Sequence, residues 1–135
     1  MDKEYPIPDL TVRDLDLVGG RLTVSREEDH LLRRFGQVDL VELNAGESIS
    51  IFRKKADEVW SVISGASTLS LTDRREESPA FENQVEIELL GSNPQAVLVP
   101  FGVECLIRSA DGAKLVRLTT HQDGTEPGDN VPGEG

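Results

Sequence analysis

Apolar and polar residues alternate with a period of two along much of the chain, which is the pattern of half-buried β-strands. Val85, Ile87 and Leu89 alternate with glutamates, and Leu69 and Leu71 alternate with serine and threonine. Further strand-like runs cover residues 21–25, 37–43, 48–52, 59–63, 96–99, 103–107 and 114–119. The pattern therefore predicts roughly eight or nine short strands.

Turn signals separate these runs at regular intervals. Glycine, proline and asparagine punctuate the chain at 44–46, 64–65, 91–94, 100–102 and 111–112. The one stretch typical of a helical turn, 26–34, is short and highly charged. We expect no crossover helix between strands, and so no parallel βαβ fold. The spacing predicts an all-β sandwich or barrel.

Composition predicts three parts along the chain. Pro6 and Pro8 favour an extended N-terminal arm over residues 1–18. Residues 19–121 hold nearly all the strand-like runs and form the predicted domain. Residues 122–135 are rich in Gly, Pro and acidic side chains, which predicts a disordered tail.

Charge and cysteine usage narrow the class of protein. The chain has 135 residues and a net charge of −11, which argues against nucleic acid and anionic membranes as partners. Its apolar runs are far too short to span a membrane as a helix. One cysteine, Cys105, forms no intramolecular disulfide and fits a reducing compartment. We therefore predict a cytoplasmic protein.

Residues 46–65 resemble the first motif of the cupin superfamily. That motif runs Gly, five residues, His-x-His, three or four residues, Glu, six residues, Gly, and this chain matches it at Gly46, Glu58 and Gly65. Phe52 and Lys54 stand at the two histidine positions. The resemblance implies a double-stranded β-helix, the cupin jelly roll barrel, in a single domain.

A second set of residues resembles the nucleotide-sugar branch of that superfamily. Pro100-Phe101-Gly102 is similar to the Pro-x-Gly of the second cupin motif, and Cys105 stands at its histidine position. Residues 71–81 are similar to the D-x-R-x-x-S-P-T-F stretch of dTDP-4-dehydrorhamnose 3,5-epimerases. The resemblance spans about residues 20–120 and implies a sugar or nucleotide-sugar ligand and a homodimer.

The substitutions at the motif positions argue against the family's chemistry. Cupin metals are held by two or three histidines and a glutamate, and only Glu58 of that set is present. We therefore predict no metal and no cofactor. The epimerases use a histidine as general base, and here the histidine positions hold Phe52, Lys54 and Cys105.

Two residues would take the place of the histidines in a proton-transfer reaction. Lys54 beside Glu58 in a dry barrel would act as a base, and Cys105 with a lowered pKa would act as a nucleophile. The simpler interpretation is that Lys54 and Glu58 form a buried ion pair in place of the metal. Cys105 is then a small apolar residue that fills the barrel.

Candidate ligand-binding residues surround the same positions. Trp60 shares a strand face with Glu58, so it either stacks on a sugar or base or belongs to the core. Arg74 would bind a diphosphate, or it balances neighbouring carboxylates. The full set of ligand-binding candidates is Phe52, Lys54, Glu58, Trp60, Arg74 and Cys105.

Three functions stay open on this evidence. The favoured one is a metal-free cupin with a sugar-binding or structural role and without histidine-based catalysis. The second is a dTDP-4-keto-sugar epimerase or isomerase with Lys54 or Cys105 as a relocated base. The third is a protein-interaction module with a filled barrel, which Phe52 favours because it fills lumen volume.

Overall fold

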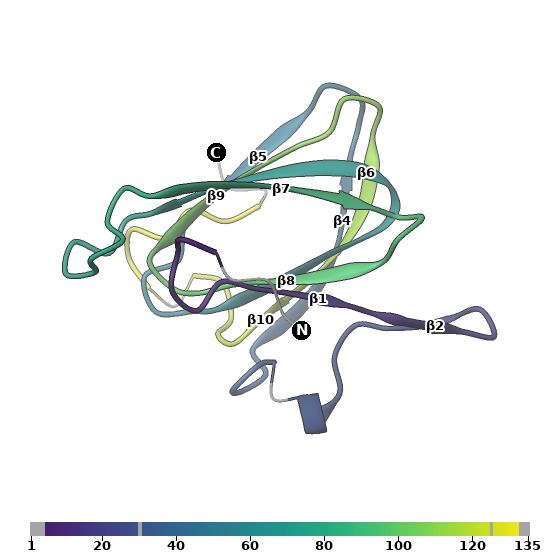
Figure 1. Ribbon diagram of the computed structural model, residues 1–135, viewed down its shortest axis with the longest axis horizontal. Helices are drawn as coiled ribbons and strands as arrows, with labels where there is room; N and C mark the ends of the chain where they lie inside the picture. Colours follow the sequence, from purple (N-terminus) through teal and green to yellow (C-terminus); the bar gives the residue numbers. More distant parts are fainter. Residues whose placement is uncertain (1–4, 30, 125, 133–135) are drawn as a thin grey trace.

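The computed structural model describes residues 5–29, 31–124 and 126–132. It contains ten strands and one short 3-10 helix (Figure 1). The strands are β1 (Thr11–Asp14), β2 (Asp16–Val18), β3 (Arg21–Thr23), β4 (Gln37–Leu43), β5 (Ser48–Ile51), β6 (Glu58–Asp73), β7 (Gln84–Leu90), β8 (Gln95–Val99), β9 (Val103–Arg108) and β10 (Ala113–Thr119). The result confirms an all-β domain.

Strand β6 belongs to both layers of the barrel. Its first half pairs with β8 and β10, in a sheet ordered β1-β8-β6-β10-β4. Its second half pairs with β7 and β9, and β9 pairs in turn with β5. All of these pairings are antiparallel, and the two layers enclose the interior seen in Figure 1.

A bend at Gly65 lets one strand serve both layers. Gly65 has a φ of +83°, and an added Cβ would lie 2.4 Å from the carbonyl oxygen of Gly112. A register shift between Lys114 and Leu115 of β10 lies opposite the same stretch of β6. The extra residue of such a bulge reverses which side chains face inward. Even-numbered residues such as Trp60 and odd-numbered ones such as Leu71 therefore reach the same core.

That core fills the space between the layers. Its fully buried members include Trp60, Leu69, Leu71, Ile107 and Leu115. A second, smaller cluster lies on the outer face of the first sheet, where residues of the 15–32 segment cover part of that face. The barrel is therefore packed with apolar side chains through most of its length.

Several predicted boundaries differ from the structure. The predicted strands 59–63 and 67–72 are one continuous strand, because the backbone pairing of β6 with its neighbours continues through the bend at Gly65. The predicted N-terminal arm contributes β1 to the first sheet and β2 to a hairpin with β3. The predicted helical turn 26–34 is reduced to a 3-10 helix at Glu27–Asp29. Within the described residues, no helix is both long and apolar enough to span a membrane.

Candidate functional site

The chemistry of the barrel is concentrated at one end, around Glu58. Thr119 at the end of β10 pairs with both Glu58 and Gln37, so β10 ends where β6 and β4 begin. The Glu58 side chain is 2% exposed. Its Oε1 accepts hydrogen bonds from Trp60 Nε1 at 2.8 Å and Arg117 Nε at 3.2 Å. Its Oε2 accepts from Arg53 at 3.0 Å and also from Arg117.

The two arginines beside Glu58 are as deeply buried as the glutamate. The side chains of Arg53 and Arg117 are 2% and 1% exposed. Arg117 also donates to Asp39 at 2.9 Å and to both carboxylate oxygens of Asp123 at 2.8 Å. Buried charges persist when they are paired and hydrogen-bonded, which is the state of this network.

The chain after β10 covers this end of the barrel. We call residues 121–124 and 126–132 the C-terminal strap. Asp123 and Asp129 of the strap accept hydrogen bonds from Arg53 at 3.0 and 2.8 Å. Asn130 exchanges backbone hydrogen bonds with Phe52 at 2.8 and 2.9 Å. In place of the predicted disordered tail, these residues are held by charge and backbone pairing.

The predicted ion pair between Lys54 and Glu58 is wrong. Lys54 is exposed, and the cations that contact Glu58 are Arg53 and Arg117. The reason is that successive side chains of a strand point to opposite faces. Ile49 and Ile51 of β5 point inward, and the same alternation places Arg53 on the inner side. Lys54 lies on the outer side of that alternation, away from the candidate base position.

Cys105 lies in the core cluster and is 1% exposed. Burial, together with the nearby charge of Glu58, raises the pKa of its thiol. A nucleophilic cysteine needs the opposite shift, because the thiolate is the reactive form. The environment favours the interpretation of Cys105 as a small apolar residue in the packed barrel.

The remaining candidates divide between the barrel and the surface. Trp60 is fully buried, packs in the core and hydrogen-bonds Glu58, and the guanidinium of Arg117 lies 5.9 Å from its ring centre. Phe52 is half-buried, lies outside the core cluster of the described residues, and pairs through its backbone with Asn130 of the strap. Arg74 is exposed and pairs with Glu104 at 3.3 Å. Of the predicted ligand-binding set, Glu58 and Trp60 contribute side chains to this network, and Lys54 contributes its backbone amide, which donates to Asp129 at 2.9 Å.

The residues of this site do not fit a cupin metal. In the part of the chain that is described, no group of three or more His, Cys, Asp or Glu side chains is arranged to hold an ion. Both oxygens of Glu58 already accept from guanidinium groups, so a cation there would face two positive charges.

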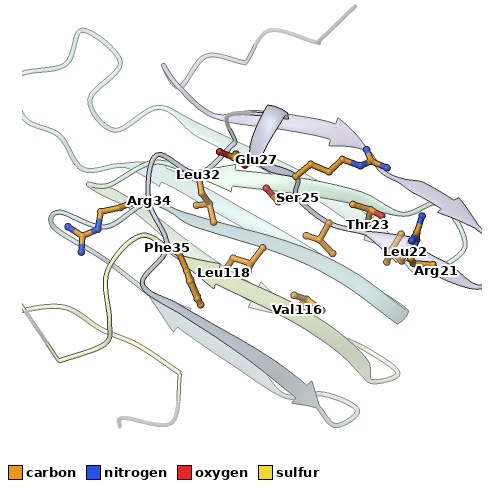
Figure 2. A pocket seen from close by; sticks show the side chains of 12 residues that line it. Arg21, Leu22, Thr23, Ser25, Glu27, Leu32, Arg34, Phe35, Val116 and Leu118 are labelled. Carbon is orange, nitrogen blue, oxygen red and sulfur yellow. The ribbon is translucent and has the colours of Figure 1, made fainter.

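A separate groove of about 540 Å³ lies outside the barrel, between the 21–27 segment and the outer face of β10 (Figure 2). Its apolar lining includes Leu32, Phe35, Val116 and Leu118. Arg21 and Arg34 lie toward its opposite ends in Figure 2. Phe35 is 61% exposed, so this face offers apolar surface that no described residue covers.

Sequence reasoning weighed Arg53 only as part of a basic cluster that would bind a diphosphate or balance carboxylates, and it did not predict that Arg53 and Arg117 contact Glu58. The signal was present for both, because Arg53 continues the inward alternation of Ile51, and Arg117 lies between the inward-facing Leu115 and Thr119. Motif spacing directed attention to positions 52 and 54 instead. The role of Asp123 had no comparable signal, since it depends on how the strap returns across the barrel.

The fold has relatives among solved structures. A dTDP sugar isomerase from Desulfovibrio desulfuricans G20 matches with a TM-score of 0.82 and 19% identity, over 94% of this chain and 86% of that one. A dTDP-4-dehydrorhamnose 3,5-epimerase from Bacillus anthracis, with TDP and PPi bound, matches with a TM-score of 0.77 and 17% identity, over 90% of this chain and 77% of that one.

A third match is an epimerase from Legionella pneumophila in complex with dTDP-4-keto-L-rhamnose, with a TM-score of 0.76 and 18% identity, over 90% of this chain and 71% of that one. No protein-family model matches the sequence, and the comparison with curated proteins finds no match. At these identities the likeness establishes architecture. The chain has the cupin fold of the dTDP-sugar epimerases and isomerases.

Proposed function

We propose that this chain is a metal-free cupin that acts by binding rather than by catalysing epimerisation. One observation carries the proposal: the Glu58 carboxylate accepts hydrogen bonds from two guanidiniums and an indole. A general base must be free to reach the carbon acid of its substrate. Both oxygens of Glu58 are instead occupied by these buried donors.

Lys54, Cys105 and His121 are not placed to supply that base in the barrel. Lys54 is exposed, and burial raises the pKa of the Cys105 thiol. His121 lies in the strap, where its Nδ1 is 2.9 Å from the hydroxyl of Thr120. These placements support loss of histidine-based catalysis and argue against a relocated base at Lys54 or Cys105.

The proposed ligand is a sugar or nucleotide-sugar that binds at the barrel end occupied by Arg53 and Arg117. Of the solved structures with a similar fold, the Legionella pneumophila epimerase is in complex with dTDP-4-keto-L-rhamnose, and the Bacillus anthracis epimerase has TDP and PPi bound. Guanidinium groups are well suited to phosphate because they donate paired hydrogen bonds. In the structure these donors are occupied by the strap, so ligand binding requires it to move.

A second candidate is a protein-interaction module with a filled barrel, and the exposed outer face favours it. Leu40 of β4 is 79% exposed and Val38 is 53% exposed. At the tip of the β2–β3 hairpin, which projects from the body in Figure 1, Leu17 and Val18 are 59% and 70% exposed. Apolar surface of this kind marks interaction sites.

We propose a homodimer as the assembly that covers this face. The accessible surface is 7721 Å², about a tenth more than the roughly 7,000 Å² expected for a compact monomer of this mass. Strand β4 is also an edge of its sheet, with β10 as its one partner in the described ladder. Such edges are commonly covered by another chain or segment.

Solvent deuterium incorporation separates binding from catalysis. The full chain is incubated with a dTDP-4-keto-sugar in D₂O, and binding of dTDP, dTDP-sugars and free sugars is followed by thermal shift. We expect a shift with a nucleotide-sugar and no deuterium at C3 or C5. Deuterium incorporation would overturn the binding proposal. A lack of any shift would favour the protein-interaction module.

A further inference from the structure

The C-terminal strap supplies most of the partners of the two buried arginines. Arg53 and Arg117 together make ten hydrogen bonds, five each. Six of the ten go to the strap, through Asp123, Asp129 and the backbone oxygens of His121 and Gln122. Each arginine has five N–H donors, so both guanidiniums are saturated only while the strap is in place.

The charges show what the strap contributes. Arg53 and Arg117 are balanced inside the barrel by Glu58 and Asp39, and the strap adds the two carboxylates of Asp123 and Asp129. A strap that moved away would remove two negative charges and six acceptors from nearly buried guanidiniums. Donors left without partners are costly, so water or an anion has to replace the lost acceptors, and an anion also restores the negative charge.

The other contacts of the strap are also mainly polar. Gln37 and Asp123 exchange hydrogen bonds at 3.2 and 3.0 Å, the Lys54 amide donates to Asp129 at 2.9 Å, and the Thr119 hydroxyl donates to the His121 oxygen at 2.7 Å. Asn130 pairs with Phe52 and donates from Nδ2 to the Ser50 oxygen at 2.7 Å, and Lys55 lies 3.7 Å from Glu126. Val131 is the one strap residue among the buried apolar side chains of the described chain. Attachment through charge, with so little apolar burial, can be exchanged for another set of anionic partners.

We propose that the C-terminal strap is an internal plug, which closes the barrel by placing Asp123 and Asp129 on Arg53 and Arg117 and is displaced by a dianionic ligand. The inference rests on the proposed ligand-binding role of the barrel and adds its regulation. The intact chain is then closed in the absence of ligand. Its apparent affinity for a dianion is reduced by the fraction of molecules that are closed.

The test compares full-length chains that differ in the strap carboxylates. The Asp123→Asn/Asp129→Asn variant weakens the plug and keeps both arginines. The Glu76→Gln/Glu77→Gln variant makes the same change in net charge at two exposed positions. Binding of inorganic phosphate is measured by calorimetry against chloride at equal ionic strength. We expect the strap variant to bind phosphate at least tenfold more tightly than the wild-type chain and the control.

Amide hydrogen exchange gives a second readout in the wild-type chain. The Asn130 amide, which donates to the Phe52 oxygen, should exchange faster in phosphate than in chloride, while amides of β6 do not change. Equal phosphate affinity in the variants would overturn the plug, as would an Asn130 exchange rate that phosphate leaves unchanged. If the double variant does not fold, Asn130→Ala loosens the strap and leaves the arginines untouched.

A parallel titration with dTDP separates this inference from the proposed function. Phosphate binding by the strap variant without any gain for dTDP would support the plug and reject a nucleotide ligand. Binding of dTDP to the wild-type chain with Asn130 still protected would support the ligand and reject the plug.

Discussion

Glu58 shows how one residue changes its role when its neighbours change. In the cupin motif this position supplies a carboxylate to a metal, whereas here the same carboxylate stabilises two arginines inside the barrel. The predicted lysine partner was wrong because motif spacing assigns positions along the chain, whereas strand parity decides which side chain points inward. The alternation of Ile49, Ile51 and Arg53 shows that the Arg53 side chain points into the barrel and that Lys54 points outward.

Substitution Glu58→Gln should destabilise the fold strongly. The change leaves Arg53 and Arg117 nearly buried with less compensating charge, and breaking a buried ion pair on one side costs about 3–5 kcal/mol. Urea denaturation measures the loss. The exposed Glu88→Gln is the matched control, expected within about 0.5 kcal/mol of the wild type. A Glu58→Gln chain as stable as that control would contradict the role assigned to the network.

Asp123 should make the stability depend on pH at the acidic end. Burial alone would raise the pKa of this carboxyl, but the hydrogen bonds and charge of Arg117 hold it below its usual value of 3.8. The folded chain therefore binds fewer protons than the unfolded chain. This contribution is fully present above that usual pKa and is lost as the pH falls through the lower folded pKa.

Denaturation at a series of pH values tests this directly. Between pH 5 and pH 2, roughly, the wild-type chain should lose more stability than Asp123→Asn, which has no carboxyl to protonate at that position. The other acidic residues titrate in both chains, so the difference between the two curves is the measured quantity. Parallel curves would show that Asp123 does not couple to folding.

At the scale of elements, strand β6 explains which parts of the fold the sequence predicts. The sequence pattern predicted both of its halves: Leu69 and Leu71 alternate with polar residues, and 59–63 is a nearly continuous apolar run. Their continuity was not predictable, since Gly65 is also a common turn residue. Its role depends on the approach of Gly112, which is distant in sequence.

Substitution Gly65→Ala should cost more than Gly46→Ala. Both glycines have positive φ, at +83° and +81°, so both variants carry the left-handed strain of roughly 1–2 kcal/mol. Only Gly65 adds a clash, with the Gly112 carbonyl oxygen 2.4 Å from the new Cβ, while Gly46 has nothing within 4 Å. Thermal or urea unfolding of the two variants gives their free energies of unfolding, and the difference between the two losses measures the effect of the clash. Equal losses would mean that the bend at Gly65 has room for a side chain.

At the scale of the whole molecule, the apolar outer face and the projecting hairpin are the surfaces that the proposed homodimer would cover. Leu40 pairs in register with Val116, so the two side chains lie side by side on the outer face of the first sheet. The core was foreseeable from alternation. The exposed apolar face was not foreseeable from the sequence. Apolar residues on the outer side of a strand recur at every second position, as they do on the inner side, so the pattern does not tell the two faces apart.

Substitution Leu40→Asp should shift the proposed dimer toward monomer without unfolding it. Leu40 is 79% exposed, so the change removes apolar contact surface and little of the core. Sedimentation velocity measures the mass, and circular dichroism checks the fold. Leu90→Asp, on strand β7, makes the same charge change elsewhere. A wild-type chain that sediments as a monomer at all concentrations would contradict the dimer.

The pairing of early strands with late ones has a consequence for biosynthesis. Strand β1 pairs with β8, and β4 pairs with β10. Thr11 therefore pairs with Leu98, and Gln37 pairs with Thr119, across long stretches of the chain. Contacts between such distant positions slow folding, because the intervening loop must be closed first. During synthesis, β1 therefore stays without this partner until residue 98 has been made, and β4 until residue 119 has been made. We therefore expect the yield of folded protein to depend on translation speed and on chaperones.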